Sequence, residues 1–133
     1  MFGSLDISTS GLVAQRTRLD AIAANIANAD VAVDPDSREV PFSERLVHFA
    51  QGDPASGSLL GVHVAEISAR GDFRKVYDPK HRFADAEGYV RYPNIDPVVQ
   101  QANAMLATRA YDANLAAVEA AKAMIEASLR ISA

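Results

Sequence analysis

The chain has 133 residues, enough for one domain with its own core, and its apolar and charged fractions of 49% and 23% are those of a folded globular protein. Thirteen basic and seventeen acidic residues give a formal net charge of −4, which argues against nucleic acid and anionic lipid as partners. Because cysteine is absent, disulfides, thiol catalysis and cysteine-ligated zinc are excluded.

Residues 4–28 predict a long amphipathic helix. Apolar side chains recur at seven-residue spacing, with one more near the end of the run: Leu5, Leu12, Leu19, Ile26 and Ile22. Asn28 can adopt the left-handed conformation that ends helices, and Pro35 lies shortly after it. We therefore expect the helix to end at Asn28.

The same N-terminal segment does not match a cleaved secretion signal. Arg16 and Arg18 stand well inside the chain instead of at its start, and Asp20 interrupts the apolar stretch that follows. The longest run without charge, residues 97–108, is also far shorter than the roughly 20 apolar residues that cross a bilayer. We expect no transmembrane helix and, if the protein is exported, a route without a cleaved signal.

The middle of the chain has a different composition from its ends. All six prolines and five of the seven glycines lie between residues 35 and 97. Short alternating segments at 60–64, 73–77 and 88–92 predict strands, and the composition of 52–58 predicts a loop. We therefore expect a small strand and loop domain over residues 31–96, between two helical ends.

Residues 97–131 predict a second, longer helix. Asp96 is a suitable N-cap, and Pro97 occupies the first helical position, where its missing N–H costs nothing. The charged residues of this helix share one arc, and the wider remaining arc is apolar. A single partner helix covers a narrower seam than that.

Two interpretations of this wide apolar arc remain open. In a compact monomer the helix packs on the first helix and on the middle segment. In an assembly, helices of neighbouring subunits cover the rest, which suits a helix of about 50 Å, longer than a 100-residue domain is wide. The assembly interpretation predicts a subunit interface formed by Leu5, Leu12, Leu19, Ile22, Ile26, Leu106, Ala110, Ala113, Ala117 and Met124.

No sequence signature of catalysis or cofactor binding is present. Residues 78–87 contain His81 and three carboxylates, but a solvated turn explains them better than a metal site does. His48 and His63 lie among apolar residues, which favours half-buried positions over a catalytic role. The one basic cluster is interrupted by acidic residues and does not predict a phosphate-binding groove: Arg70, Arg74, Lys75, Lys80 and Arg82. We expect no catalytic site, cofactor, metal or small-molecule substrate.

Two sets of motifs are familiar. Ser10-Gly11-Leu12, Ala14-Gln15, Arg18-Leu19-Asp20 and the segment 24–29 resemble the N-terminal signature of bacterial flagellar axial proteins, the rod, hook and hook-associated subunits. Segments 85–90, 92–96 and 109–114, with Lys122, resemble the proximal rod subunits of the flagellar basal body. The motif residues are Asn25, Asn28, Gly88, Tyr89, Pro93, Asn94, Asp96, Tyr111 and Asn114.

The resemblance implies a mainly α fold with a small β-containing middle. The terminal helices would pair in a coiled-coil-like inner-tube domain of residues 1–30 and 97–133, and residues 31–96 would form the outer domain. It also implies a non-enzymatic subunit that assembles helically into the periplasmic rod and transmits torque. Its partners would be further copies, other rod subunits, the proximal membrane ring and export gate, and the flagellar type III export apparatus. Residues 31–58 depart from the family pattern.

A second class of function fits the same helices. A small helical adaptor or export chaperone would bind a partner helix without polymerising. Such a protein stops at closed symmetry, whereas a rod subunit grows through heterologous contacts.

Overall fold

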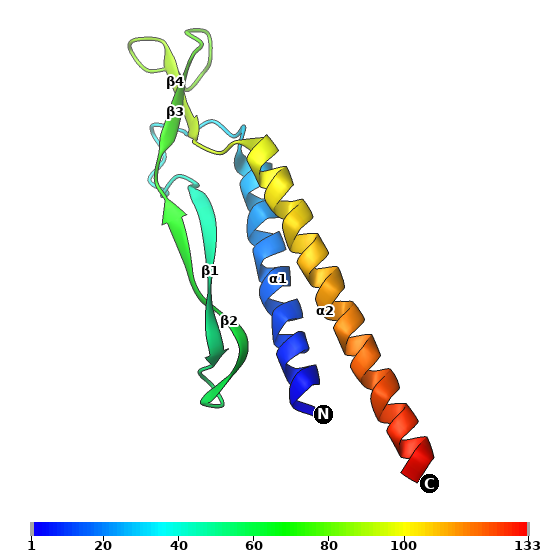
Figure 1. Cartoon of the computed structure of the whole chain (residues 1–133). Coiled ribbons are helices and arrows are strands. Elements are labelled where there is room, and N and C mark those ends of the chain that lie inside the picture. Colours follow the sequence, from blue (N-terminus) through cyan, green and yellow to red (C-terminus); the bar gives the residue numbers. More distant parts are fainter. Residues whose placement is uncertain (1, 133) are drawn as a thin grey trace.

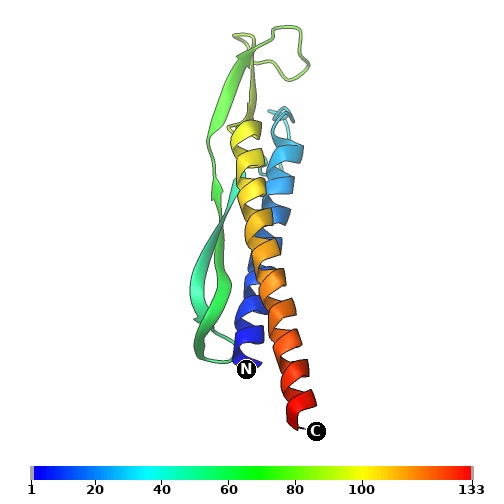
Figure 2. The ribbon, with the colours of Figure 1, turned by 45° about the vertical axis from the view of Figure 1, so that its right-hand side comes forward.

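The computed structural model describes residues 2–132, and over this range six elements follow one another. They are α1 (Phe2–Asn28), β1 (Glu44–Asp53), β2 (Ser58–Arg70), β3 (Phe73–Tyr77), β4 (Tyr89–Pro93) and α2 (Pro97–Ser132). The helices lie side by side and run in opposite directions (Figures 1 and 2). The antiparallel hairpin β1–β2 lies alongside α1, and the hairpin β3–β4 extends past the end of the helix pair (Figure 1).

Both predicted helices are confirmed, and α2 begins with the expected Asp96 cap. Helix α1 ends at Asn28 as predicted, but Asn28 does not adopt the left-handed conformation, since no non-glycine residue of the described range has a positive φ. The Asn28 side-chain amide donates to the carbonyl of Ala24 at 2.8 Å, and the Asp96 carboxylate accepts the N–H of Val98 at 2.9 Å. Helix α2 is about 54 Å long at 1.5 Å per residue. Its C-terminal end passes the start of α1 (Figures 1 and 2). Neither helix of the described range carries an apolar stretch that would cross a bilayer.

The middle of the chain has one strand more than the sequence predicted, and one of the predicted strands is longer. Strands at 73–77 and 88–92 are confirmed by β3 and β4, and the strand at 60–64 is the centre of a longer β2. The sequence did not predict β1 as a strand, because a register shift at His48/Phe49 breaks its alternation and both of its faces are partly covered. The predicted loop at 52–58 is the β1–β2 turn, with Gly52 and Gly57 at positive φ.

The core between the helices is made of small side chains. Ala14 and Ala21 from α1 and Ala107 and Ala121 from α2 are buried, together with Ile22 and Val118. Gly11 lets the helices approach still more closely, since a Cβ there would lie 2.7 Å from the Asn114 amide nitrogen. The helix-rich ends and the small β middle of the predicted fold class are therefore present.

A second apolar cluster joins the end of α1 to β4. Val33, Val90, Pro93 and Ile95 are buried, and the Val33 N–H donates to the carbonyl of Arg91 at 2.8 Å. This cluster anchors the segment that follows α1 to the β3–β4 hairpin.

Candidate subunit interface

Helix α2 has two apolar sides, and among the described residues only one of these sides is buried against another element. Ala107, Val118 and Ala121 face α1 and are buried. Displaced from them by about 100° around the helix axis, Leu106 and Met124 are 58% and 59% exposed. Two series at seven-residue spacing make up this second side, which we call the free seam: Val99, Leu106, Ala113 and Ala117, Met124, Ile131.

The composition of the free seam is that of a packing surface. Its middle consists of alanines and its ends of larger apolar residues, a pattern that lets another helix approach closely at the centre. Contiguous exposed apolar side chains of this kind mark a site of interaction. Asp112, Glu119 and Glu126 lie on another side of the helix, in the exposed charged arc.

The predicted interface residues of α2 divide between the two sides. Leu106, Ala113, Ala117 and Met124 are all exposed and belong to the free seam, whereas Ala110 is half-buried on the side facing α1.

The predicted interface residues of α1 are less accessible. Leu5, Leu12 and Leu19 are half-buried, and Ile26 is 38% exposed. Ile22 is only 6% exposed, so it serves the core within one chain and offers little surface to a neighbour. The heptad pattern alone did not distinguish these two uses, because both helix sides follow the same spacing.

The motif residue Asn25 is the centre of a buried polar cluster. It is 1% exposed, its side-chain oxygen accepts the Arg45 N–H at 2.8 Å, and its nitrogen donates to the Arg45 carbonyl at 2.9 Å. The same nitrogen lies 3.2 Å from Oε1 of buried Gln100, whose nitrogen donates to Glu44 at 2.8 Å. Asn25 therefore joins α1 to both β1 and α2. Sequence reasoning missed Gln100 and Glu44, since neither has a pattern that distinguishes it from surface residues.

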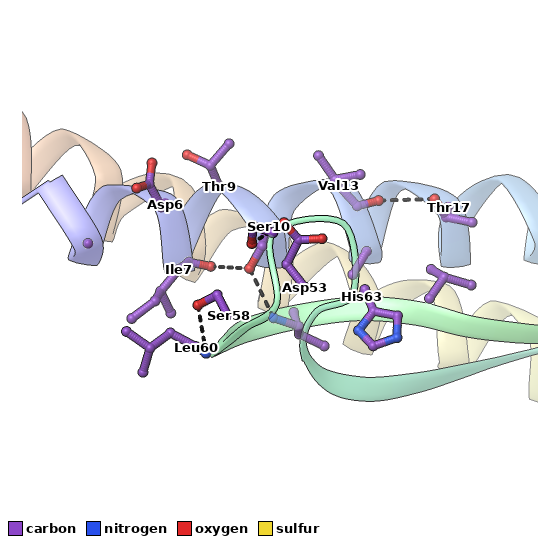
Figure 3. A pocket seen from close by; sticks show the side chains of 15 residues that line it. Asp6, Ile7, Thr9, Ser10, Val13, Thr17, Asp53, Ser58, Leu60 and His63 are labelled. Atoms are coloured by element: carbon purple, nitrogen blue, oxygen red, sulfur yellow. Dashed lines mark hydrogen bonds between the residues drawn. The ribbon is translucent and has the colours of Figure 1, made fainter.

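Ser10 fastens the other end of the β1–β2 hairpin to α1. Its hydroxyl donates to the Ile7 carbonyl at 2.6 Å and accepts the Val62 N–H at 3.1 Å (Figure 3). The neighbouring Gly61 has a φ of 91°, and a Cβ there would lie 2.8 Å from the Ser10 oxygen. In the Ser10-Gly11 motif, Ser10 therefore binds the β1–β2 hairpin, and Gly11 allows α2 to pack closely on α1.

Other motif residues shape the β3–β4 hairpin and the entry into α2. Buried Gly88 has a φ of 86°, and a Cβ there would meet the Tyr77 ring at 2.9 Å. The Tyr89 ring packs edge-on against Tyr77 with centroids 5.3 Å apart. The Asn94 N–H donates to the Asp72 carbonyl at 3.0 Å, and Tyr111, like Asn114, is half-buried on the α1 side of α2.

The segment 78–87 forms the loop of this hairpin. The Asp85 carboxylate accepts the N–H groups of Glu87 at 2.9 Å and Tyr89 at 2.8 Å, and the bond from Tyr89 lowers the pKa of Asp85 below its ordinary value. His81 accepts the Phe83 N–H at 3.1 Å. Across residues 2–132, no group of three or more histidines and carboxylates is placed to hold a metal ion.

The remaining candidates for chemistry have structural contacts. His48 lies 2.8 Å from the Ser68 hydroxyl, and His63 lies 2.8 Å from the Gly52 carbonyl. Arg74, from the basic cluster, contacts Asp30 at 2.7 Å and covers the Tyr92 ring, so it fixes the end of α1 to the β3–β4 hairpin.

A groove of about 670 Å³ runs between the first half of α1 and the β1–β2 turn (Figure 3). Apolar side chains of Ile7, Val13 and Leu60 line it, and Val13 and Leu60 are both 62% exposed. Asp6 and Asp53 also line it. The Ser56 hydroxyl, which donates to Asp53 at 2.7 Å, lowers the pKa of Asp53, so this carboxylate is charged at neutral pH.

The sequence is similar to flagellar rod proteins over both of its helical ends. A family model described as flagella basal body rod protein matches residues 5–32, and one described as flagellar basal body rod FlgEFG protein C-terminal matches residues 86–131. The flagellar basal-body rod protein FlgC of Bacillus subtilis (strain 168) is 36% identical over 145 aligned residues, which cover 98% of this chain and 97% of that protein. The chain belongs to the FlgC family of basal-body rod proteins.

Two further FlgC proteins agree over nearly the same span. That of Aquifex aeolicus (strain VF5) is 40% identical over 129 residues, covering 95% of this chain and 92% of the relative. That of Salmonella typhimurium (strain LT2) is 40% identical over 128 residues, covering 95% and 93%. The two family models fall on α1 and on the stretch from β4 to α2, which hold the helix pair, the free seam, and Asn25 and Gln100 of the Asn25 cluster. FlgC proteins are structural rod subunits, and an adaptor role is not favoured.

Proposed function

We propose that this chain is a structural subunit of the proximal flagellar rod, which assembles helically through its terminal helices and transmits torque without catalysis. The names of its relatives support a rod subunit, and the free seam of α2 carries the proposal for how it assembles. Burying apolar surface contributes about 25 cal/mol per Å². Because α2 exposes Leu106 and Met124 in the single chain, the burial of these side chains stabilises the protein only when a neighbouring subunit covers them.

The neighbours in this proposal are further copies of the chain and other rod subunits. A contact between the free seam and a different surface of the next subunit is heterologous, and such contacts continue into open helical assemblies instead of closing. Closely packed alanines at the centre of the seam, including Ala113 and Ala117, would make the contact stiff. Stiffness is what torque transmission requires of a rod.

In this proposal the subunit has an inner and an outer domain and lies in the periplasm. Residues 1–30 and 97–133 would form a coiled-coil-like inner domain, and 31–96 an outer domain, consistent with the contacts between α1 and α2 and the two hairpins beside and beyond them. The subunit would reach the periplasm through the flagellar type III export apparatus without a cleaved signal. At the base of the rod it would meet the proximal membrane ring and the export gate.

Electron microscopy of isolated basal bodies tests this proposal. A small epitope is inserted after Ser56, in the exposed β1–β2 turn, and the chain replaces the resident copy in a motile strain. We expect gold-labelled antibody at the proximal rod, and motility at the level of the untagged strain. An untagged strain treated with the same antibody is the control. Label on the hook or the filament would contradict the assignment. So would a tagged protein that is found only as a soluble closed oligomer.

A further inference from the structure

One face of the β3–β4 hairpin carries two positive charges directly opposite each other. Lys75 and Arg91 are partners in the register of the two strands, so their side chains point to the same face, and both residues are exposed. Like charges in this position destabilise a strand pair. Neither β3 nor β4 contains an acidic residue that would offset the repulsion.

Aromatic rings lie on both sides of this pair of charges. The Arg91 guanidinium lies over the Phe73 ring, 5.3 Å from its centroid. On the other side, Tyr77 is the cross-strand partner of Tyr89, and these residues are 64% and 38% exposed. Because a guanidinium that stacks on a ring keeps its N–H groups at its edge, Arg91 is held in place with donors still available. We call the face formed by these residues the cationic face: Phe73, Lys75, Tyr77, Tyr89 and Arg91.

The opposite face of the hairpin uses its cation within the chain. Arg74 contacts Asp30 at 2.7 Å and covers the Tyr92 ring. In the part of the chain that the structure describes, neither Lys75 nor Arg91 forms an ion pair with a carboxylate. The hairpin extends past the helix pair (Figure 1), which leaves room for a neighbour on its cationic face.

Asp85 reduces the charge of the cationic face without cancelling it. Its carboxylate accepts the N–H groups of Tyr89 and Glu87, and the bond from Tyr89 is the main cause of the lowered pKa of Asp85. The charge of Lys75 contributes to that shift, so these two groups lie close enough to interact. Two positive charges against one negative charge still leave the face positive.

We propose that the cationic face binds an acidic segment of a neighbouring protein subunit. This inference rests on the proposed function and names the chemistry of one of the contacts between subunits. One carboxylate of the segment would lie at the edge of the Arg91 guanidinium, which can donate two parallel N–H bonds to it. A second carboxylate would lie near Lys75, and Tyr77 would cover the segment between them. Binding would thus offset the repulsion between Lys75 and Arg91 that the single chain retains.

The composition of the cationic face favours a protein over other polyanions. Tyrosine and arginine are enriched among the residues that dominate the binding energy of protein–protein interfaces. Nucleic acids and anionic membranes are bound by more extensive arrays of cations. This face offers two cations, and the loop of the same hairpin, with three carboxylates and two basic residues, adds no further positive charge.

Photo-cross-linking in motile cells tests the chemistry of the partner. A photoreactive phenylalanine replaces Tyr77 in the full chain, basal bodies are isolated, and mass spectrometry identifies the cross-linked segment. We expect a protein segment with two carboxylates about two to four residues apart, a spacing that reaches both cations in an extended chain. The control carries the same amino acid at Tyr92, on the opposite face, and should not give this adduct. An adduct with phospholipid, with a segment that lacks carboxylates, or with nothing would overturn the inference.

Neutralising the two cations supplies a second readout. Lys75→Gln combined with Arg91→Gln should lower the adduct yield and the amount of subunit in isolated basal bodies, each about tenfold. Lys80→Gln combined with Arg82→Gln is the matched control. It removes the same charge from the loop of the hairpin together with a similar cation–ring contact, that of Arg82 with Phe83 at 4.2 Å. The control should change neither amount, and an equal fall in both variants, or a fall in neither, would contradict the proposal.

Lys75→Gln alone separates binding from folding. It removes the repulsion and keeps the contact of Arg91 with Phe73, so amide exchange in β3 and β4 of the free subunit should be equal to or slower than in the unsubstituted chain. Faster exchange would assign Lys75 a structural role and overturn the inference. If the subunit enters the rod and cells swim but no acidic adduct forms, the inference fails and the proposed function stands. If the unsubstituted chain never enters the rod, the proposed function itself fails.

Discussion

The Asn25 cluster and the free seam of α2 differ in where their groups find partners. At Asn25, one amide side chain serves the backbone of β1 and the side chain of Gln100, all within the chain. Along the free seam, Leu106 and Met124 remain largely exposed. The same helix pair therefore carries residues that stabilise the fold of the subunit and other residues that we propose for its assembly. Substitutions at the first kind should lower the stability of the free subunit, and substitutions at the second kind should prevent assembly without unfolding it.

The largest effect is expected from a charge on the free seam. Ala117→Glu places a carboxylate at the centre of a close contact, where overpacking and an unpaired charge cost roughly 2–5 kcal/mol per subunit. Because Ala117 is exposed in the single chain, the free subunit should keep its helix content and solubility. Swimming and rod assembly should be lost. Circular dichroism and a motility assay measure the two outcomes.

Glu119→Ala is the matched control for this substitution. It lies two residues away in the charged arc, removes only exposed pairings worth a few tenths of a kcal/mol, and improves helix propensity. The strain should swim normally. Normal swimming by the Ala117→Glu strain would refute the free seam as an interface.

Asn25→Ala should show the opposite pattern. The substitution leaves the Arg45 N–H and carbonyl and the Gln100 oxygen without their partner, and buried polar groups left unpaired cost about 1–3 kcal/mol each. We expect the free subunit to lose about 3 kcal/mol of unfolding free energy, measured by urea denaturation. Asp20→Ala, on the exposed side of the same helix, should change it by less than about 0.5 kcal/mol.

Gly88→Ala tests a smaller contribution to the stability of the subunit, from the backbone conformation of the β3–β4 hairpin. The substitution forces a side chain into left-handed backbone and against the Tyr77 ring, which should cost about 1–2 kcal/mol. Gly71→Ala is the control, because Gly71 has neither a positive φ nor any atom within 4 Å of the added Cβ. Faster amide exchange confined to β3 and β4 is expected for Gly88→Ala alone. Equal exchange in both variants would show that Gly88 is dispensable.

The smallest expected effect is a pH dependence of the β3–β4 loop. The pKa of Asp85 is lowered in the folded chain by the N–H of Tyr89, so its contribution is present above the unfolded value of about 3.9 and is lost as pH falls through the folded pKa. NMR shifts of the Tyr89 and Glu87 amides should therefore move below pH 4. In Asp85→Asn this step should vanish, and a step that persists would assign it to another carboxyl.

Sequence alone predicted both helices, the Asp96 cap of α2, strands β3 and β4 and the centre of β2, because these depend on local signals such as Asp96-Pro97 and the alternation at 73–77. The left-handed cap expected at Asn28 is absent. Strand β1 escaped prediction, since its register shift removes the alternation that marks strands. The sequence also identified the apolar residues of α2. It did not show which of them pack on α1 and which stay exposed, because that depends on the side of α2 against which α1 lies. The groove was also beyond prediction, because it joins residues 6–17 to the distant 53–64.

The close approach of Gly11 to Asn114 also bears on the order in which we expect the subunit to fold. These residues lie about a hundred positions apart, and closing a loop of that length costs roughly 4 kcal/mol of chain entropy before any contact compensates it. Ser10 and Asn25 reach the β1–β2 hairpin over much shorter loops. A chain released from its N-terminus would thus form α1 and the hairpin early. Gln100 would complete the Asn25 cluster only when the final helix emerged.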